Sequence, residues 1–428
     1  MLDINLIREN PEVVRRDLAR RGAVDKIEML EELIKLDKEW RRLQTKLSNL
    51  RHERNVITFE VARLKREGKD SHKKVQLAEK LTEEIRTLEK EADAYKGKIN
   101  YILLRLPNIL HDSVPLGAGE EDNVVIKKWG EIPKFDFTPL DHIELGLKLG
   151  VLDIERAAKI SGARFFYLKR EAVTLDMALI NFALEEMRQR GFIPIEPPFL
   201  MRRKPYEGVT AMGDFEEMLY KVEDEDLYLI ATSEHPIAAM FMNEVLLEKD
   251  LPLRYVGVSP CFRKEAGAHG KDTKGIFRTH QFNKVEQFVF CKPEESWVEH
   301  ERLLENAESI IQKLGLPYRI TNVCTGDIGT VAAKKYDIEV WMPAQKQYRE
   351  VISCSNCTDY QARRLNIKYR EMEGRPPKGF VHTLNSTAIA TGRIIVAILE
   401  NFQERDGSVR IPEALQSYMR GVTRISKD

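Results

Sequence analysis

The sequence has few of the features that mark secreted or membrane proteins. Its 428 residues include five cysteines, too few for a disulfide framework in a chain of this length. The longest apolar run, Ile394 to Leu399, is far shorter than the roughly 20 residues of a membrane-spanning helix. The amino-terminal residues contain no apolar core of the kind found in signal peptides. We therefore expect a soluble protein of the reducing cytoplasm, with no membrane partner.

The chain also lacks net charge, because 68 Lys and Arg balance 68 Asp and Glu. This balance argues against a globally basic nucleic-acid-binding protein. The charge is unevenly spread, since residues 1–106 contain 25 Lys and Arg against 20 Asp and Glu. A modest positive bias on an extended segment is compatible with binding a phosphate backbone, but a solvated helical surface produces the same bias.

The strongest periodic pattern lies in the amino-terminal quarter. Two series of mostly apolar residues recur at alternating steps of four and three, which is the heptad pattern of packed helices. The first series is Met29, Leu33, Leu36, Trp40, Leu43, Leu47, Leu50, Arg54, Ile57, Val61 and Leu64. The second is Ala78, Leu81, Ile85, Leu88, Ala92, Tyr95, Ile99, Ile102 and Leu106. The short break at Gly68–Ser71 makes the two helices antiparallel neighbours.

These series predict an antiparallel coiled-coil hairpin over about residues 26–106, within an amino-terminal domain of residues 1–110. At about 1.5 Å per residue the first helix would extend roughly 60 Å, too long to be buried in a small domain, so we expect a protruding arm. Coiled coils mediate self-association more often than they bind RNA, and the pattern alone leaves both roles open.

A second domain is expected over residues 111–428, because the chain is too long for one ordinary core. Prolines and glycines punctuate residues 107–135, which indicates a linker. A long amphipathic helix over 172–190 is followed by a proline-rich segment, residues 190–200. Its prolines restrict it to the edge of a sheet. An edge strand suits contact between two copies, and an ordinary connection is the alternative.

The second domain is organised around the segment from Tyr255 to Phe290. Its ends are apolar and typical of strands, and its middle, residues 266–275, is rich in glycine and charge. We expect two strands joined by a long loop. Because alternate strand residues share a face, side chains of one kind gather on one surface of this hairpin. That surface is expected to carry Arg263, Glu265, Arg278, Phe282 and Glu286.

This set of side chains suits ATP and an amino acid bound together. Two guanidiniums can grip phosphate oxygens, a phenylalanine ring can support a purine, and a carboxylate can hold an ammonium group. A solvated hairpin with cross-strand ion pairs remains the alternative from spacing alone.

Three further segments carry candidate binding groups. Thr232, Ser233 and Glu234 follow a short strand, and the Thr232 hydroxyl and the Glu234 carboxylate suit a ligand with an amine, although the residues alone favour a helix cap at Ser233 or Thr232. Over residues 348–353 the alternation puts Glu350 on one face with Tyr348 and Ile352. Glu350 and the Ser353 hydroxyl are oxygen ligands of the kind that Mg²⁺ prefers, although a strand glutamate is often purely structural.

The third segment is residues 382–401. Asn385, Ser386 and Thr387 precede a helix that is apolar on nearly every side, so the helix is expected to be buried and the residues before it held rigidly. Arg393 opens the helix. It is either a phosphate ligand or an incidental arginine.

The residues Arg263-Lys264-Glu265 and the run FRTHQFNKVEQ resemble the second signature motif of class II aminoacyl-tRNA synthetases, and specifically of seryl-tRNA synthetases. The segment with Pro198 resembles the first motif and residues 382–401 the third, and the likeness covers essentially the whole chain. It implies an α+β fold, with an antiparallel β-sheet catalytic domain flanked by helices and an amino-terminal antiparallel coiled-coil arm.

The resemblance also implies an activity. The chain would act as a cytoplasmic serine–tRNA ligase that attaches L-serine to tRNA(Ser) through a seryl-adenylate, using ATP and Mg²⁺. It would form a homodimer through the catalytic domain, with the arm reaching the long variable arm of the tRNA. Serylation of tRNA(Sec) is left open. Threonyl and prolyl enzymes share the three motifs, but the arm fits the seryl type.

Residue roles follow from the same resemblance. The catalytic residues would be Arg263, Glu265 and Arg393. Serine would be bound by Thr232, Ser233, Glu234, Arg263, Glu286, Asn385 and Thr387. ATP would be bound by Arg263, Lys264, Glu265, Arg278, Phe282, Glu350, Val351, Ile352, Ser353 and Arg393, and Mg²⁺ by Glu350 and Ser353.

Some residues depart from the bacterial pattern. Many bacterial members carry alanine at Ser233, an apolar residue at His235 and Gly-Ser at Ser386-Thr387, so this chain looks more like the archaeal branch. Two other functions stay open: a paralogue that binds a nucleotide or activates an amino acid without charging tRNA, and a structural coiled-coil protein. The complete motifs and the arm argue against both.

Overall fold

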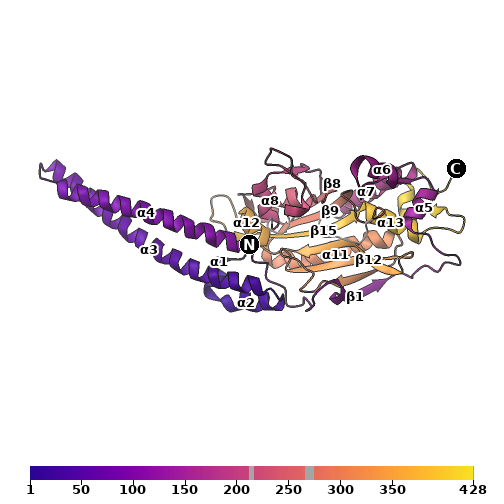
Figure 1. Cartoon of the computed structure of the whole chain (residues 1–428), viewed down its shortest axis with the longest axis horizontal. Coiled ribbons are helices and arrows are strands. Elements are labelled where there is room, and N and C mark those ends of the chain that lie inside the picture. Colours follow the sequence, from indigo (N-terminus) through magenta and orange to yellow (C-terminus); the bar gives the residue numbers. More distant parts are fainter. Residues whose placement is uncertain (212–215, 266–273, 428) are drawn as a thin grey trace. The chain divides into compact units, whose positions relative to one another are not determined.

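The computed structural model describes residues 1–211, 216–265 and 274–427. Two compact units divide the chain, Met1–Pro107, here the arm unit, and Asn108–Asp428, here the sheet unit (Figure 1). Most of the glycine-rich loop expected at residues 266–275 lies outside the described residues. In the part of the chain described here, no helix is both long and apolar enough to cross a membrane.

The arm unit consists of four helices, of which the last two form the expected hairpin. The helices are α1 (Ile4–Glu9), α2 (Pro11–Arg20), α3 (Val24–Arg66) and α4 (His72–Leu103). Every member of the two predicted heptad series is buried or half-buried, so the predicted seam is confirmed. Leu47, Ile85, Leu88 and Ala92 form the core between α3 and α4. In Figure 1 the two long helices run side by side.

A buried carboxylate ties α1 to α3. Asp37 of α3 is 3% exposed, and its two oxygens accept hydrogen bonds from Arg8 Nη2 at 2.7 Å and Arg8 Nε at 3.0 Å. Arg41, one turn further along α3, also donates to Asp37 at 2.9 Å. Helix α1 was not expected from the sequence, because its six residues are too short for a periodic pattern.

The sheet unit is built on an eight-stranded sheet in the order β1-β10-β11-β12-β15-β9-β8-β4. All neighbours are antiparallel except β4 and β8, which confirms the expected fold class. The strands are β1 (Val124–Trp129), β10 (Tyr318–Asn322), β11 (Lys334–Met342), β12 (Gln347–Asn356), β15 (His382–Ala390), β9 (Gln281–Cys291), β8 (Leu253–Phe262) and β4 (Ile193–Ile195).

The two faces of the central strand β9 carry different side chains. Val285, Val289 and Cys291 join the larger core, where the sheet packs against α5, α7, α11 and α13. Phe288 and Phe290 point to the other side and join a second core with α8, α10 and α12. Glu286 belongs to the same alternate set as Phe288, so it lies on the side of the second core.

The remaining elements cover these faces and connect the strands. The helices are α5 (His142–Lys148), α6 (Ile154–Ser161), α7 (Glu171–Gln189), α8 (Arg203–Val209), α10 (Glu234–Ala239), α11 (Ser296–Lys313), α12 (Tyr360–Leu365), α13 (Thr391–Asn401) and α14 (Glu413–Gln416). The short strands are β2 (Leu152–Asp153), β3 (Tyr167–Leu168), β5 (Leu200–Met201), β6 (Tyr228–Leu229), β7 (Val245–Leu247), β13 (Lys368–Arg370), β14 (Gly379–Phe380), β16 (Val409–Arg410) and β17 (Arg424–Ile425).

Helix α7, strand β4 and strand β1 lie in segments for which the sequence provided an expectation. The helix over 172–190 is α7, and the proline-rich segment contains β4 at the sheet edge, as expected. The linker interpretation of residues 107–135 was wrong in part, because β1 forms there and pairs with β10. All six residues of β1 are exposed, so no alternating pattern marked it as a strand.

Candidate active site

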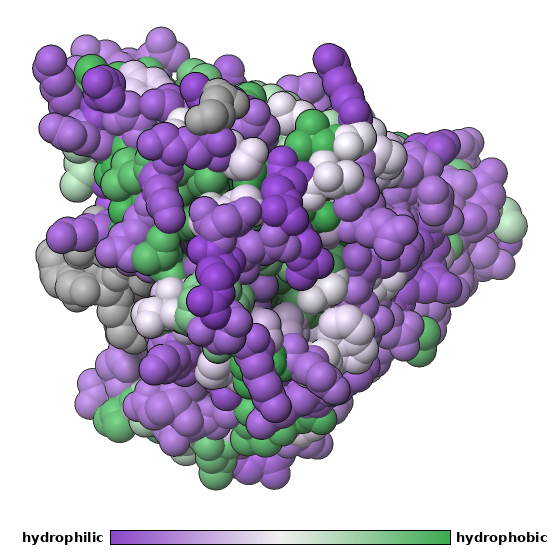
Figure 2. All heavy atoms as spheres, turned by 90° about the vertical axis from the view of Figure 1, so that its right-hand side faces the viewer, coloured by the Kyte–Doolittle hydropathy of each residue, from purple (hydrophilic) through white to green (hydrophobic). Residues whose placement is uncertain are grey.

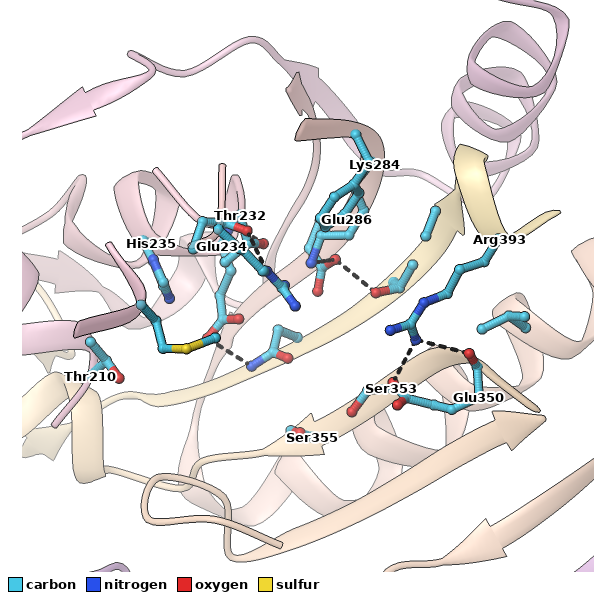
Figure 3. A pocket seen from close by; sticks show the side chains of 18 of the residues that line it. Thr210, Thr232, Glu234, His235, Lys284, Glu286, Glu350, Ser353, Ser355 and Arg393 are labelled. Carbon is cyan, nitrogen blue, oxygen red and sulfur yellow. Dashed lines mark hydrogen bonds and ion pairs between the residues drawn. The ribbon is translucent and has the colours of Figure 1, made fainter. Parts of the chain in front are cut away.

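A cavity of about 520 Å³ opens on the second-core side of the sheet, within the sheet unit (Figure 3). Its floor is formed by strands β9, β15 and β12. On β9 the lining residues are Phe282, Lys284 and Glu286, each two positions from the next. This spacing confirms that alternate residues of the predicted returning strand face one site.

One end of the cavity contains the carboxylate of Glu286, which two neighbouring side chains hold in place. Glu286 is 1% exposed, and its Oε2 lies 2.6 Å from Lys284 Nζ. Thr387 of β15, which pairs with Glu286 across the sheet, donates its hydroxyl to the same Oε2 at 3.0 Å. Glu286 is therefore fixed by an ion pair and a hydrogen bond on one of its two oxygens.

A second carboxylate faces this end from helix α10. Glu234 is the first residue of α10, and its Oε1 accepts hydrogen bonds from Gln361 Nε2 and Asn385 Nδ2, each at 3.2 Å. Its backbone N–H donates to the Thr232 hydroxyl at 3.2 Å. Burial and the nearby charge of Glu286 raise the pKa of Glu234 to about 7.

Arg263 lies between this end and the rest of the cavity. Its Nε donates to the carbonyl of Ala231 at 3.3 Å, and its guanidinium carbon lies 5.2 Å from the centre of the Phe282 ring. Its charge acts on both Glu234 and Glu350. One guanidinium thus faces carboxylates at both ends of the cavity.

The other end gathers cationic and aromatic side chains. Arg278 Nη1 lies 3.3 Å from Glu265 Oε2, while Arg278 Nε is buried and has no hydrogen-bond partner among the described residues. The expectation that Arg263, Glu265 and Arg278 lie on the two strands of the hairpin was wrong. Strand β8 ends at Phe262 and β9 begins at Gln281, so Arg263, Glu265 and Arg278 lie beyond the strands. All three still line the cavity, from the two ends of the connection that joins β8 to β9.

Glu350 and Arg393 also line this end of the cavity. Arg393 Nη1 donates to the Glu350 carbonyl at 2.8 Å and lies 3.3 Å from its carboxylate. Burial alone would raise the pKa of Glu350, but Arg393, Lys335, Arg263 and Arg278 outweigh it and lower the pKa. Glu350 therefore stays ionised near neutral pH.

The alternation expected along β12 is broken. The register between β11 and β12 shifts at Glu350, where Val351 has no paired residue on β11. Around this bulge Glu350 and Ser353 line the cavity, and Ile352 is 1% exposed in the larger core. Val351 borders both, because it lines the cavity and is 2% exposed in the same core. The expectation that Glu350 and Ile352 share a face was therefore wrong.

These residues fit a magnesium ion. Glu350 supplies an ionised carboxylate, and Ser353 a hydroxyl two residues beyond the bulge. Asp337, paired with Ser353 across the two strands, has a buried Oδ1 that no described residue hydrogen-bonds. Within the described residues no three His, Cys, Asp or Glu side chains cluster closely enough to enclose a metal, so a Mg²⁺ ion here would need oxygens from a ligand or water.

Most residues singled out in the sequence line this cavity. They are Thr232, Glu234, Arg263, Glu265, Arg278, Phe282, Glu286, Glu350, Val351, Ser353, Asn385, Thr387 and Arg393. Three others do not. Ser233 is fully buried with its hydroxyl directed at the Gly257 carbonyl, Lys264 is exposed beside Tyr220, and Ile352 lies in the core.

Sequence reasoning assigned no binding role to several lining residues, among them Thr210, His235, Lys284 and Lys335. Only Lys284 carried a usable signal, because it stands midway between Phe282 and Glu286 on one strand face. His235 is buried, and its Nδ1 lies 2.8 Å from the Tyr206 hydroxyl. Burial, Lys284 and Arg263 lower the pKa of His235 to about 3, so this imidazole is neutral near pH 7.

The comparison with known proteins covers the whole chain. The family described as the seryl-tRNA synthetase N-terminal domain matches residues 1–110, and the tRNA synthetase class II core domain (G, H, P, S and T) matches residues 220–402. The serine–tRNA ligase of Methanocella arvoryzae is 54% identical over 99% of this chain and 99% of its own.

Two solved structures agree with this comparison. A crystal structure of seryl-tRNA synthetase from Pyrococcus horikoshii complexed with ATP covers 100% of both chains at 53% identity, with a TM-score of 0.95. The cytoplasmic serine–tRNA ligase from Naegleria fowleri in complex with AMP is 36% identical, with a TM-score of 0.90, and covers 100% of this chain and 99% of its own. The present chain belongs to the seryl-tRNA synthetase family.

Proposed function

We propose that this protein activates L-serine with ATP to form seryl-adenylate and then transfers the seryl group to tRNA(Ser). The observation that supports this most directly is the two-ended cavity. One end holds two carboxylates with hydroxyl and amide neighbours, and the other holds arginines, a phenylalanine ring and an ionised glutamate. Arg263 lies where the two ends meet, at the position where an amino-acid carboxylate would approach a phosphate.

The carboxylate end suits serine. Glu234 Oε1 is occupied by two amide donors, so its other oxygen is available to the ammonium group. Glu286 and Thr387 offer hydrogen bonds to the serine hydroxyl. A site built to hydrogen-bond a hydroxyl rejects an analogue that lacks it by about 10⁴- to 10⁵-fold, so we expect alanine to be a very poor substrate.

The arginine end suits ATP. Phe282 would support the adenine, Arg263 would hold the α-phosphate, and Arg278 and Arg393 would hold the outer phosphates. The serine carboxylate attacks the α-phosphorus, a new C–O–P bond forms, and the bond to pyrophosphate breaks. No covalent protein nucleophile is needed, because the residues act by positioning and charge stabilisation. Glu265 would orient the adenine or ribose side.

Glu350 and Ser353 would hold Mg²⁺, which supplies charge neutralisation between the phosphates when bound. Arg393 orients Glu350 through the hydrogen bond to its backbone carbonyl. Glu350 keeps its charge because the pKa is lowered by the surrounding cations. Four of the expected site residues have side chains that lie outside the cavity or only border it. They would contribute through their backbone atoms or by packing against the lining residues. These residues are Ser233, Lys264, Val351 and Ile352.

Two further parts of the proposal concern partners. We assign residues 1–110 to a tRNA-binding domain whose α3–α4 hairpin contacts tRNA(Ser), and we expect the reaction to occur in the cytoplasm. Charging of tRNA(Sec) is a separate question that the same assay answers.

We also propose a homodimer through the sheet unit. Val173 and Met177 on α7 and Ile193 on the edge strand β4 are 42%, 54% and 53% exposed, although all three are apolar. Figure 2 shows further apolar side chains among polar ones on the side that carries α5 and α6. Such surface favours contact with another chain. Sedimentation equilibrium should give twice the chain mass of 49.5 kDa, and a monomer would contradict the proposal.

The charging reaction tests the proposed function. Radiolabelled serine is supplied with ATP, Mg²⁺ and a tRNA(Ser) transcript, and acid-precipitable label is counted. A matched transcript without the variable arm and a tRNA(Sec) transcript serve as comparisons. We expect efficient charging of the intact tRNA(Ser) and much weaker charging of the shortened one. Adenylate formation without charging of any transcript would favour the paralogue alternative.

A further inference from the structure

A buried ammonium group stands directly beside the proposed serine site and has no role in the scheme above. Lys284 lies on β9 between β8 and β15, two residues before Glu286. The side chains of Lys284 and Glu286 are 8% and 2% exposed, and their charged atoms are 2.6 Å apart. Figure 3 shows both pointing into the same part of the cavity.

The hydrogen bonds of Glu286 are distributed unequally between its two oxygens. Lys284 Nζ and the Thr387 hydroxyl both donate to Oε2. Among the described residues, no hydrogen bond or ion pair reaches Oε1. Oε1 is not enclosed by protein atoms, because it does not belong to the fully buried polar atoms without a partner. It therefore borders the open cavity. The protein thus satisfies one oxygen and presents the other to a ligand.

In the described part of the chain, Lys284 is one of two cations that face the carboxylates at this end. The charges of Lys284 and Arg263 both act on Glu234, and the Lys284 ammonium group also contacts Glu286 directly. Without Lys284, the repulsion between the two buried carboxylates would be less compensated, and Glu286 Oε2 would keep only the hydrogen bond from the Thr387 hydroxyl among the described residues. The Glu286 carboxylate would then be held less firmly, and the position of Oε1 would no longer be fixed.

We propose that Lys284 is a positioning residue for serine selection, which holds the Glu286 carboxylate in the orientation in which Oε1 accepts the hydrogen bond of the serine hydroxyl. This inference rests on the proposed function, because it assigns a hydroxyl-binding role to Glu286. Lys284 itself does not contact serine. Its effect is therefore expected in the choice between serine and alanine, and not in ATP binding.

The titratable groups around the pair come from several elements. Glu234 and His235 face it from α10, Cys261 from β8 and Cys354 from β12, and Arg263 approaches from the segment after β8. Burial keeps the imidazole and both thiols neutral, since it lowers the pKa of His235 and raises the pKa of the two cysteines. Lys284 and Arg263 are therefore the cations that stabilise the two carboxylates.

A double-mutant cycle tests this inference. The variants are Lys284→Met, Glu286→Gln and the two together, and each is assayed by pyrophosphate exchange with serine and with alanine. Methionine keeps the length of the lysine stem without its charge. Lys335→Met is the matched control, because Lys335 lines the same cavity but faces Asp337 at 3.9 Å. Thermal unfolding with and without ATP checks that each variant is folded.

We expect Lys284→Met to lower kcat/KM for serine by about 10- to 100-fold, the loss that accompanies a removed charge-assisted hydrogen bond. The alanine value should change little, so the serine-to-alanine ratio falls by a similar factor, while KM for ATP stays the same. In the Glu286→Gln background, Lys284→Met should have little further effect, because its role is exerted through Glu286. Lys335→Met should leave the ratio unchanged.

Two results would overturn the inference. One is a Lys284→Met effect that adds in full to that of Glu286→Gln. The other is an equal loss for serine and alanine, which would indicate general damage to the cavity. If Lys284→Met does not fold, the double variant, which loses both charges, is compared with Glu286→Gln alone. Equal activity of the two would support the inference, and lower activity of the double variant would contradict a role of Lys284 through Glu286. An inactive wild-type protein would instead refute the proposed function.

Discussion

The arm unit and the cavity of the sheet unit are stabilised in opposite ways. Across α3 and α4 the same contact recurs at each heptad, and the ion pairs beside it, such as Lys46–Glu84 and Arg51–Glu89, are exposed. In the cavity each contact occurs once and joins distant segments, as when Asn385 donates to Glu234 across 151 residues of sequence. A substitution in the arm therefore removes one of many similar contacts along the hairpin. A substitution in the cavity removes a contact that has no equivalent elsewhere in the site.

The largest effect is expected from Arg263, which faces both ends of the cavity. Arg263→Ala should lower serine-dependent pyrophosphate exchange by about 10²- to 10³-fold or more, the loss typical of one positioned donor to a developing charge. The thermal unfolding temperature should change little, because within the described part of the chain the guanidinium makes one hydrogen bond, to the Ala231 carbonyl. Arg405→Ala, at a side chain that is 67% exposed, is the matched control. Near-normal exchange by Arg263→Ala would remove this residue from the proposed mechanism.

Removal of the arm unit should separate the two half-reactions. A chain starting at residue 108 retains both cores of the sheet unit, so serine activation should stay near the wild-type rate. Charging of tRNA(Ser) should fall by about 100-fold, equivalent to roughly 3 kcal/mol of lost RNA contacts. Steady-state kinetics with tRNA as the varied substrate measure this difference. Undiminished charging would show that the arm does not bind the tRNA.

A pH profile should report on Glu234. The ammonium group of serine needs the ionised carboxylate, so kcat/KM for serine should fall about tenfold per pH unit below pH 7, near the raised pKa of Glu234. Glu234→Gln should remove this acid limb and lower the plateau.

The same group makes a prediction for stability without serine. Because the pKa of Glu234 is raised from its usual 4.5 to about 7, the folded protein binds this proton more tightly than the unfolded chain. Its contribution to stability is therefore full below pH 4.5 and is lost as the pH rises through 7. In Glu234→Gln this part of the pH dependence should disappear. An unchanged profile of unfolding temperature against pH would contradict the assignment.

The smallest effect on activation is expected in the arm. Leu47 is 1% exposed between α3 and α4, and Leu47→Ala should destabilise the arm unit by about 2–5 kcal/mol. Leu77→Ala, at a side chain that is 43% exposed on α4, should change stability by less than about 0.5 kcal/mol. Neither should alter pyrophosphate exchange. A clear loss of exchange in Leu47→Ala would show that the two units are energetically coupled.

The same comparison explains what could be predicted from the sequence. The seam of the arm was predicted residue by residue, because a heptad depends on local spacing. Along β9 the period of two correctly grouped Phe282 and Glu286, and the resemblance to known motifs supplied their partners. Lys284 was overlooked although it shares their spacing, since a lysine between two site residues is as compatible with solvent as with burial.

The parts that could not be predicted depend on tertiary structure. The β12 bulge, which separates Glu350 from Ile352, is set by pairing with β11 and leaves no mark in the alternation itself. Strand β1 exists only because β10 pairs with it, since all its residues are exposed. Arg278 and Glu265 lie in the connection between β8 and β9, outside the strands. Such a connection has no regular period, so the sequence spacing could not predict that they reach the cavity. Thr210 and Lys335 come from segments without a binding motif.

The most direct test of the account is pyrophosphate exchange by the purified protein with serine, threonine and alanine supplied separately. We predict exchange with serine alone, and with alanine a signal lower by about 10⁴- to 10⁵-fold. Exchange at similar rates with serine and alanine would contradict the hydroxyl-binding role of Glu286 and Thr387. No exchange with any of the three would contradict the central claim that this cavity activates serine.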